Sequence, residues 1–549
     1  MPRLSSSIQV LVVGAGPTGL FLASELRRYG VHVRIIDRRQ APTTQSRATD
    51  LQPRSLEILE QAGALSGIRP GGRPLHAINI YSDARPIARM DFRGLDTHYN
   101  HMFASSQCNT ELGLREHLKA LGGRVERGVE LVAIEQHERA STCTLQSHDG
   151  HIEVLRCEYV VGCDGARSTT RKLLGIPFPG ATYDEHYLLA DARVTWDLNR
   201  DELHGFIVRS GSLLVLALPG HDEYRLFADI APSDRREPCR EAFQEILDER
   251  APMPATVHEV GWASRFRQHH RLVPRYRVGR CFLAGDSAHI HSIIPGQGLN
   301  LGIQDAYNLG WKLGLVCRGQ ARAALLASYE AERRPLALLT LRTTDIFHKT
   351  FTVRNRLGQR LRDVLLPPVG GAPWVHGRLV DLCAELSHNY RRSPVVSRLR
   401  ARIFKGLQAG ERAPDVCLTT DDGSTTRLFA HFGVFAHTLL VFLGGGLGSL
   451  NIDRKKVEQL AASLPQIGGH VVAPVELRVV VAGPEGLPAG LDRWVQIDDR
   501  RGAIHRRYGA KRGGLCLIRP DGYIGFLGPL EAPPLLDYLA GRACLVSAE

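Results

Sequence analysis

A short unit near the amino terminus most constrains the fold of this chain. Residues 8–13 read IQVLVV, a run typical of a buried strand, and the glycine-rich turn GAGPTG follows at residues 14–19. LFLASELRRYG then shows the apolar stripe of a helix that stops at Gly30, and VHVRIID is a second apolar run that ends at Asp37. A strand, a crossover helix and a second strand in so short a span predict an α/β fold with a parallel sheet.

The turn of this unit also predicts a ligand. Gly14, Gly16 and Gly19 have the GxGxxG spacing, which permits a tight turn, close approach of backbone to a pyrophosphate, and close packing of helix on strand. The helix N-terminus then faces the phosphates, and Asp37 can bind ribose hydroxyls. GxGxxG alone is a weak signal, but here both strands, the helix and the acid agree with it. The sequence therefore predicts a site for a dinucleotide with a free ribose, either FAD or NAD.

Composition excludes several classes of protein. The 549 residues indicate two or three domains, and 43% hydrophobic with 23% charged residues is typical of a folded globular protein. The formal net charge is +12, yet the basic residues are spread among 57 acidic ones without a basic block, so we expect no nucleic-acid partner. No apolar run is long enough to span a membrane, and the early one leads into a glycine turn rather than a cleavage site, so a cytoplasmic protein is expected.

Cysteines and histidines do not indicate a metal or a redox centre. The 11 cysteines are scattered, and none form a CxxC pair. His289 and His291 have no third ligand at a suitable spacing, so we interpret both as structural and expect no metal.

Two further apolar strands run into an aspartate. YVVGCDGARSTTRKLLG reaches Asp164, with Arg167 and Ser168 just after it, and CFLAGD reaches Asp286. Either aspartate alone is best interpreted as a helix cap. Together with the glycine motif, they indicate three segments that converge on one nucleotide.

In this order and combination, the three segments resemble the single-component FAD-dependent aromatic hydroxylases, the group that includes para-hydroxybenzoate hydroxylase and phenol hydroxylase. The resemblance implies a Rossmann-like FAD-binding domain at residues 1–180 and 276–400, with an antiparallel β-sheet substrate domain inserted at residues 181–275. It favours FAD over NAD as the held dinucleotide, and NADPH or NADH then serves as a transient co-substrate.

The resemblance also implies which residues hold FAD. The glycines approach the pyrophosphate, Asp37 the adenosine ribose, and Asp286 a ribityl hydroxyl. The segment GLNLGIQDAYNLGWKL is expected to form a helix. The backbone N–H groups at its start, around Gly298 to Asn300, face the carbonyl edge of the flavin and stabilise the negative charge of the reduced ring. The predicted cofactor-binding residues are Gly14, Gly16, Pro17, Thr18, Gly19, Asp37, Arg38, Arg47, Gln107, Asp164, Asp286, Gly296, Gly298, Leu299 and Asn300.

One loop departs from the family pattern. The family usually has Pro-Pro, a small residue and Gly-Gly after the histidine, whereas this chain reads HSIIPGQG, with Ser292 and Ile293 at the proline positions and Pro295 on a glycine position. Because proline fixes φ and removes a donor, we expect the backbone over the flavin to differ. Ile293 and Ile294 are predicted to line the substrate pocket, which favours a hydrophobic aromatic substrate over a small carboxylated one.

Three residues are candidates for catalytic roles: Asp50, Arg225 and Pro295. Asp50 stands where many relatives carry glycine, and it is either a loop-capping aspartate or a pocket carboxylate that accepts a phenolic proton. Arg225, in YRLFADI, resembles an arginine near the flavin. Its neighbours Tyr224 and Phe227 are candidate pocket residues, although aromatic residues in strands commonly belong to the core.

The sequence pattern changes near residue 405. LLVFLGG, LRVVVAG, WVQID and LCLIRPDGYIGFLG are short apolar strands, and a Pro-Asp-Gly turn joins the last pair. Residues 405–549 resemble the thioredoxin-like C-terminal domain of the phenol-hydroxylase branch. Cys417 and Cys516 are isolated, so no redox chemistry is expected in this domain. We expect the domain to have a structural role or to form a subunit contact, for example in a homodimer.

The activity that the resemblance implies is aromatic hydroxylation. NAD(P)H reduces FAD, O2 forms a flavin C4a-hydroperoxide, and its distal oxygen attacks an electron-rich phenolic or polycyclic ring, while the protein orients the ring and excludes water. Simple phenols, nitro- or halophenols, phenylpropanoid acids and polyketide aromatics all remain open as substrates. Two alternatives are a flavin-dependent dehydrogenase or reductase without oxygen insertion, and a non-catalytic FAD-binding accessory protein.

Overall fold

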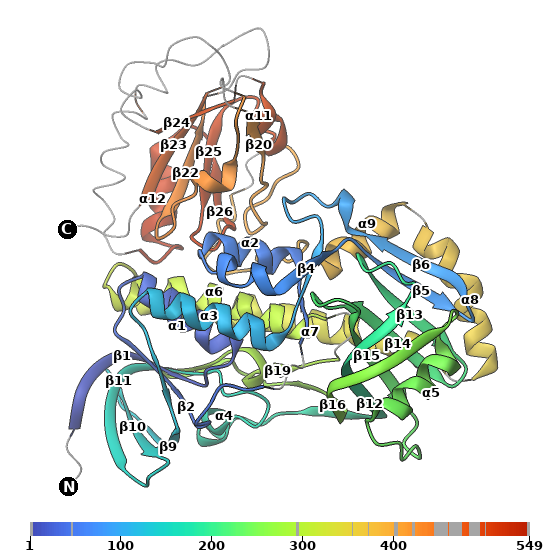
Figure 1. The fold of residues 1–549 in the computed structure, drawn as a ribbon. Helices are drawn as coiled ribbons and strands as arrows, with labels where there is room; N and C mark the ends of the chain where they lie inside the picture. Colours follow the sequence, from blue (N-terminus) through green and yellow to red (C-terminus); the bar gives the residue numbers. More distant parts are fainter. Residues whose placement is uncertain are drawn as a thin grey trace. The chain divides into compact units, whose positions relative to one another are not determined.

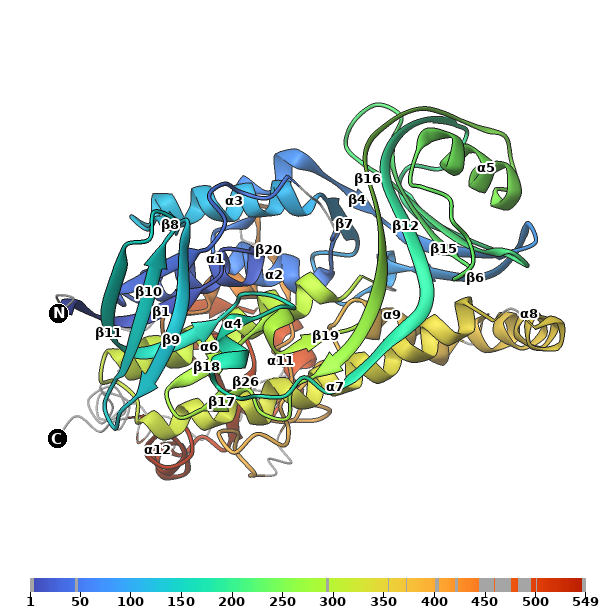
Figure 2. The same ribbon diagram turned by 90° about the horizontal axis from the view of Figure 1, so that it is seen from below.

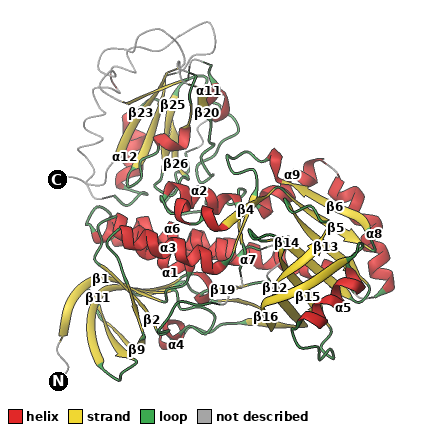
Figure 3. Ribbon diagram, viewed as in Figure 1, coloured by secondary structure: helices red, strands yellow, loops and turns green. Residues whose placement is uncertain are grey.

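The chain forms two compact units. The first comprises Met1–Arg27, His32–Ala306 and Pro335–Ser387, and the second comprises Arg28–Val31, Tyr307–Arg334 and His388–Glu549. Figures 1 and 3 show their helices and strands. The computed structural model describes residues 4–44, 48–292, 296–353, 355–371, 373–399, 404–419, 423–443, 459, 475–481, 495–499 and 501–545.

A largely parallel sheet forms the amino-terminal core of the first unit. β1 pairs in parallel with β2 on one side and with β11 on the other, and β11 pairs in parallel with β18. The strand order is β17-β18-β11-β1-β2-β8, with β10 and β9 attached beside β11. The elements are β1 (Leu4–Val13), α1 (Pro17–Arg28), β2 (Val33–Asp37), β8 (Val125–Arg127), β9 (Val129–Gln136), β10 (Ser141–Ser147), β11 (Ile152–Gly162), α4 (Thr169–Leu173), β17 (Arg277–Val278) and β18 (Cys281–Leu283). The predicted strand, turn, helix and strand at the amino terminus are confirmed.

This topology brings distant segments to one place. Because β1, β2, β11 and β18 are parallel, their carboxyl ends meet at the same edge of the sheet. The residues that follow or end these strands are Gly14, Asp37, Asp164 and Asp286. The three segments singled out in the sequence therefore lie at one sheet edge.

A second, mainly antiparallel sheet has the order β19-β16-β12-β15-β14-β13-β5-β6. Figure 2 shows β12 and β16 as two long curved strands side by side. The hairpin β5–β6 joins this sheet through a parallel pairing of β5 with β13, although it lies in the amino-terminal third of the chain. The strands are β5 (Ala77–Ser82), β6 (Arg85–Asp91), β12 (Gly180–Trp196), β13 (Glu202–Val208), β14 (Gly211–Ala217), β15 (Glu223–Ile230), β16 (Ala255–Leu272) and β19 (His289–Ile290).

The two faces of this sheet differ. Helix α5 (Arg240–Arg250) covers one face, and its Phe243 and Ile246 pack with Leu226 and Ala228 of β15 in an apolar core. The other face carries an aromatic cluster described below. Further elements of the first unit are β3 (Asp50–Leu51), α2 (Pro53–Gln61), β4 (Gly72–Leu75), β7 (Met102–Ser105), α3 (Gln107–Ala120), α8 (Arg356–Gly371) and α9 (Pro373–Cys383); α6 (Gly298–Cys317) and α7 (Ala327–Phe351) each have residues in both units.

The second unit contains a five-stranded sheet of order β24-β23-β22-β25-β26. β22, β23 and β24 are parallel to one another, whereas β25 runs antiparallel to β22 and β26 antiparallel to β25. The strands predicted in this region are present, and Gly522 adopts a φ of +78° in the expected turn. The elements are β22 (His437–Phe442), β23 (Val475–Val481), β24 (Val495–Asp498), α11 (Ala503–Tyr508), β25 (Gly514–Ile518), β26 (Ile524–Gly528) and α12 (Ala532–Ala540).

A buried ion network stabilises the second unit. The Glu332 carboxylate accepts hydrogen bonds from Lys312 Nζ at 2.7 Å and from Arg519 at 2.6 Å. The same Arg519 pairs with Asp521, which also accepts from the Trp311 indole N–H at 3.1 Å. Burial lowers the pKa of Lys312 to about 8, although the charge of Glu332 opposes this shift. Removing one partner from such a network leaves a buried charge uncompensated.

None of the helices in the described part of the chain combines the length and the apolar composition needed to cross a bilayer.

Candidate active site

A cavity of about 640 Å³ opens at the shared edge of the parallel sheet. It extends from the glycine turn after β1 to β16 of the second sheet and to the first turn of α6. Its volume lies within the range of small-molecule and cofactor sites. Predicted site residues that line it are Gly14, Gly16, Pro17, Thr18, Asp37, Arg38, Asp50, Gln107, Asp164, Asp286, Gly296, Gly298 and Leu299. Arg47, Ile293, Ile294 and Pro295 lie outside the described residues.

The glycine turn has the shape that a dinucleotide requires. Gly14 has a φ of +102°, and a Cβ there would lie 2.7 Å from the carbonyl carbon of Cys163. A Cβ at Gly19 would overlap the carbonyl oxygen of Gly14, so this glycine lets α1 pack closely on the strand. A Cβ at Gly16 would meet no atom within 4 Å, because this residue borders the open cavity. The backbone at Gly16 is therefore open to a pyrophosphate.

Asp37 and Asp164 are held by backbone and hydroxyl donors. The Asp37 carboxylate accepts the backbone N–H groups of Ala15 and Arg39, both at 2.8 Å. Asp164 accepts from the Ser168 hydroxyl at 2.5 Å and from the backbone N–H of Thr170 at 2.9 Å, so it caps the turn that leads into α4. Asp286 is exposed at the edge of the cavity.

The loop before α6 is tied to the segment that contains Asp50. The Asn300 side-chain amide donates to the carbonyl oxygens of Asp50, at 3.0 Å, and Gly296, at 2.8 Å, and its oxygen accepts from the Gln52 backbone N–H at 2.8 Å. Gly296 has a φ of +87°, and a Cβ there would overlap the Asp50 carboxylate. Asn300 is fully buried, so it holds the start of α6 from behind the cavity.

Asp50 itself is a half-buried carboxylate on the cavity wall. Its Oδ2 accepts a hydrogen bond from the Gln52 side chain at 3.0 Å. Burial raises its pKa to about 7, although the Gln52 hydrogen bond and the charge of Arg225 act in the opposite direction. A carboxyl group with such a pKa can exchange a proton near neutral pH.

Arg225 lies one layer behind the cavity. Its guanidinium forms a bidentate pair with Asp191, with both contacts at 2.7 Å, and donates to the Thr49 hydroxyl at 2.7 Å. Only 3% of the Arg225 side chain is exposed, and Arg225 is not among the residues that line the cavity. Arg225 therefore positions the segment before Asp50 rather than facing the cavity.

The structure places Tyr224, a predicted pocket residue, away from the cavity. Side chains alternate along a strand, so the side chains of Arg225 and Phe227 share one face of β15 and that of Tyr224 lies on the other. Tyr224 is 1% exposed in the core beneath α5, with its ring centroid 6.0 Å from that of Trp196. It belongs to that core and not to the pocket.

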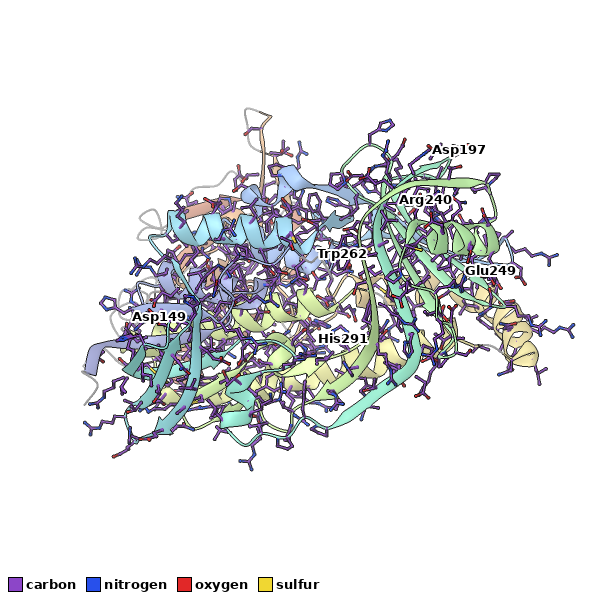
Figure 4. All side chains as sticks on the ribbon, turned by 60° about the horizontal axis from the view of Figure 1, so that its bottom comes forward. Asp149, Asp197, Arg240, Glu249, Trp262 and His291 are labelled. Carbon is purple, nitrogen blue, oxygen red and sulfur yellow. The ribbon has the colours of Figure 1, made fainter. Side chains whose placement is uncertain are left out.

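Phe227 belongs to an aromatic cluster on the opposite face of the sheet. Its ring stacks on Tyr187 with centroids 4.9 Å apart, and Phe266 lies 6.0 Å from the same Tyr187. Trp262 also packs against this cluster, and Figure 4 labels it on β16 together with His291 just after β19. Phe266 lines the cavity, so the cluster forms an apolar wall behind it.

The two histidines of the loop differ in their surroundings. His289 Nε2 lies 2.7 Å from Asp305, which also accepts the Gly285 backbone N–H at 3.0 Å, so this histidine ties the strand end to α6. His291 lines the cavity, and its Nδ1 donates to the Ser292 carbonyl at 2.9 Å. Burial lowers the pKa of His291 to about 4, so its ring is neutral at pH 7. Within the described residues, no group of three or more side chains is arranged to hold a metal.

Comparison with known proteins identifies the family. Residues 7–344 match the sequence family described as FAD binding domain. Pentachlorophenol 4-monooxygenase from Sphingobium chlorophenolicum is 33% identical over 546 residues, which cover 97% of this chain and 96% of that protein. The chain belongs to the FAD-dependent aromatic monooxygenases.

The chain is also similar to other members of this monooxygenase family. The Streptomyces rimosus subsp. rimosus protein named 12-dehydrotetracycline 5-monooxygenase/anhydrotetracycline 6-monooxygenase is 36% identical over 94% of both chains. The structure of the anhydrotetracycline hydroxylase OxyS from Streptomyces rimosus matches with a TM-score of 0.71 and 31% identity, covering 98% of this chain and 99% of that one. The chain is thus similar along nearly its whole length to enzymes of this family, whose cofactor is FAD and which use O2.

Sequence reasoning missed several cavity residues of this monooxygenase. Phe266 and Gln268 both line the cavity from β16, and Glu111 lines it from α3. Burial raises the pKa of Glu111, although its hydrogen bond from Gln107 opposes this shift. Phe266 and Gln268 are two positions apart, so the alternation of a strand places them on one face. The alternation shows which residues share a face, but not which face meets the cavity.

Proposed function

We propose that this monooxygenase hydroxylates a hydrophobic phenolic or polycyclic aromatic compound. The observation that supports this choice is the continuity of the cavity, which runs from the glycine turn to Phe266 and the aromatic cluster behind it. The names of the relatives refer to pentachlorophenol, to 12-dehydrotetracycline and to anhydrotetracycline, that is, to one phenol and two polycyclic compounds. The isoleucines predicted in the loop before α6 agree with an apolar pocket, and that assignment rests on the sequence alone.

The roles of the chain's residues follow from their positions. In this proposal, Gly14 and Gly16 receive the FAD pyrophosphate, Asp37 the adenosine ribose, and Gln107 with Asp286 the ribityl chain. FAD, when bound, supplies the reduced ring on which O2 is activated after NAD(P)H has given its hydride. The N-terminus of α6, at Gly298, presents its positive end to negative charge, which favours the reduced anionic ring. The aromatic wall orients the substrate ring and excludes water.

We also propose roles for the separate parts of the chain. Residues 1–180 and 276–400 bind FAD, residues 181–275 form the substrate sheet with β5 and β6 added, and residues 405–549 are a thioredoxin-like domain without redox function. The order of the five-stranded sheet and its parallel and antiparallel pairs support the thioredoxin-like assignment. Cys516 is buried and Cys417 exposed, each as a free thiol. A cytoplasmic homodimer completes the proposal.

The test is a panel of phenols offered to the purified protein with FAD. We expect NADPH or NADH oxidation to rise on addition of an apolar phenol, and a product that gains one oxygen atom derived from 18O2. Substrate-stimulated oxidation without oxygen insertion would favour a reductase, and FAD binding without turnover would favour an accessory protein. If small carboxylated phenols are the best substrates, the apolar-pocket assignment is wrong.

A further inference from the structure

Among the residues that the structure describes, the half-buried carboxylate of Asp50 forms no ion pair. Its Oδ2 accepts from Gln52, whereas Oδ1 receives no hydrogen bond from the part of the chain that the structure describes. The guanidinium of Arg225, whose charge acts on Asp50, is already paired with Asp191. Half-burying a carboxylate without an opposite charge is unfavourable, so its presence on a cavity wall calls for a ligand that bonds to its second oxygen.

The geometry points to a proton acceptor: we propose that Asp50 Oδ1 takes the proton of the substrate's phenolic hydroxyl during oxygen transfer. This inference rests on the proposed function and names the residue that acts on the substrate. The carboxylate is held for such a role by two hydrogen bonds, from Gln52 to one oxygen and from Asn300 to the Asp50 backbone carbonyl at 3.0 Å. It also lies so close to Gly296 that an added Cβ there would overlap it. Pre-organised groups of this kind are what general base catalysis needs.

The charged surroundings of Asp50 set its proton affinity. From the second sheet, the charge of Arg225 favours the ionised form, and Arg225 is itself paired with Asp191. His291, in the loop before α6, is neutral at pH 7. Glu111, on α3, is a second carboxyl group at the cavity, and burial raises its pKa as well. Burial outweighs these charges, so the pKa of Asp50 is about 7 and both of its forms are populated near neutral pH.

The proposed step balances as follows. The phenolic O–H bond breaks, its proton goes to Asp50 Oδ1, and the freed electron pair forms a carbonyl while ring electrons attack the oxygen atom that the reduced cofactor and O2 supply. The ring carbon then loses its hydrogen as a proton, which ends in the water formed from the second oxygen atom, and the carbonyl oxygen takes back the proton from Asp50. The ring becomes aromatic again and the carboxylate is regenerated. The second atom of O2 leaves as water with the electrons of NAD(P)H.

The first test compares pH profiles. Because the base must be ionised, kcat/KM for hydroxylated product should rise with pH to a plateau above about 7 in the parent enzyme. Asp50→Asn should lower kcat/KM for a weakly acidic phenol by about 10²- to 10⁴-fold and remove this acidic limb. Asp50→Gly, which adds no bulk beside Gly296, should do the same, and it guards against misfolding of the first variant. Asp149→Asn, the same charge change on an exposed turn (Figure 4), is the matched control and should keep the limb.

The second test varies the acidity of the substrate. A strongly acidic phenol such as pentachlorophenol is already ionised at neutral pH and needs no base, so the loss in Asp50→Asn should shrink as the phenol becomes more acidic. An equal loss for all phenols, or a retained acidic limb in both variants, overturns the assignment of Asp50 and leaves the hydroxylase function standing. If the parent enzyme hydroxylates no phenol at all, the proposed function fails first, and the role of Asp50 fails with it.

Discussion

Replacing the first two glycines of the turn one at a time should separate folding from cofactor binding. At Gly14, an alanine would adopt a φ of +102°, which costs about 1–2 kcal/mol in a residue with a side chain. Its Cβ would also lie 2.7 Å from the Cys163 carbonyl carbon and 2.8 Å from the Asp164 Cα, an overlap with backbone that costs about 1–3 kcal/mol more. Gly14→Ala should therefore lower the free energy of unfolding of the FAD-free protein by about 2–5 kcal/mol.

Gly16→Ala should have the opposite profile. Its Cβ meets no atom within 4 Å, so the FAD-free protein should be as stable as the parent within about 0.5 kcal/mol. The added methyl group projects where the pyrophosphate is proposed to lie, so FAD affinity should fall at least about tenfold, which corresponds to about 1.4 kcal/mol. Because bound FAD stabilises only the folded state, the stabilisation of the variant by added FAD should fall correspondingly.

The assays are urea unfolding of the FAD-free proteins and titration with FAD followed by flavin fluorescence. Gly30→Ala is the matched control, because Gly30 has a φ of +73° but an added Cβ would meet no atom within 4 Å. This variant should lose only about 1–2 kcal/mol of its free energy of unfolding, the cost of the left-handed backbone conformation. The reasoning is refuted if Gly16→Ala folds normally and still binds FAD as tightly as the parent, because the turn would then not receive the pyrophosphate.

Three further outcomes are expected. Asp286→Ala should weaken FAD retention by about 1.5–3 kcal/mol through loss of a charged hydrogen bond, measured as the FAD-to-protein ratio after gel filtration, and an unchanged ratio would contradict its placement on the ribityl chain. Glu332→Gln should destabilise the protein by about 3–5 kcal/mol in urea unfolding, since two buried cations lose their shared anion; a change below about 1 kcal/mol would show that the network is dispensable. Cys417→Ser and Cys516→Ala should leave turnover per bound FAD within about twofold of the parent, and a collapse with folding intact would reveal redox chemistry in the C-terminal region.

Local patterns in the sequence predicted the parts of the fold that depend on local physics. The glycine turn and its flanking strands follow from spacing and apolar runs, which act over a few residues, and so do the strands of the second unit. The pairing of β5 with β13 joins residues more than a hundred positions apart, and no local pattern specifies such a pairing. For that reason, the hairpin β5–β6 was not assigned to the substrate sheet.

The candidate site shows the same division. The resemblance at Arg225 does not say which face of β15 carries the side chain of Tyr224, and strict alternation places the two side chains on opposite faces. The approach of Gly296 to Asp50 joins positions far apart in the chain and depends on how Asn300 bridges them. The sequence alone allowed two interpretations of Asp50, a loop-capping aspartate and a pocket carboxylate. Only the contacts around Asp50 favour the second one.

The buried ion network also has a consequence for synthesis of the chain. Glu332 and Lys312 are made early, whereas Arg519 follows Glu332 by 187 residues, near the carboxyl end. At typical translation rates of about 5–20 residues per second, this interval lasts on the order of 10–40 seconds. Throughout it, Glu332 lacks its arginine, so this part of the second unit cannot complete its burial until the last residues leave the ribosome. A nonsense mutation just before β25, which removes β25, β26 and α12, would therefore leave the charges of Glu332 and Lys312 without Arg519. We expect such a truncated chain to be degraded, although every predicted FAD-binding residue had been translated.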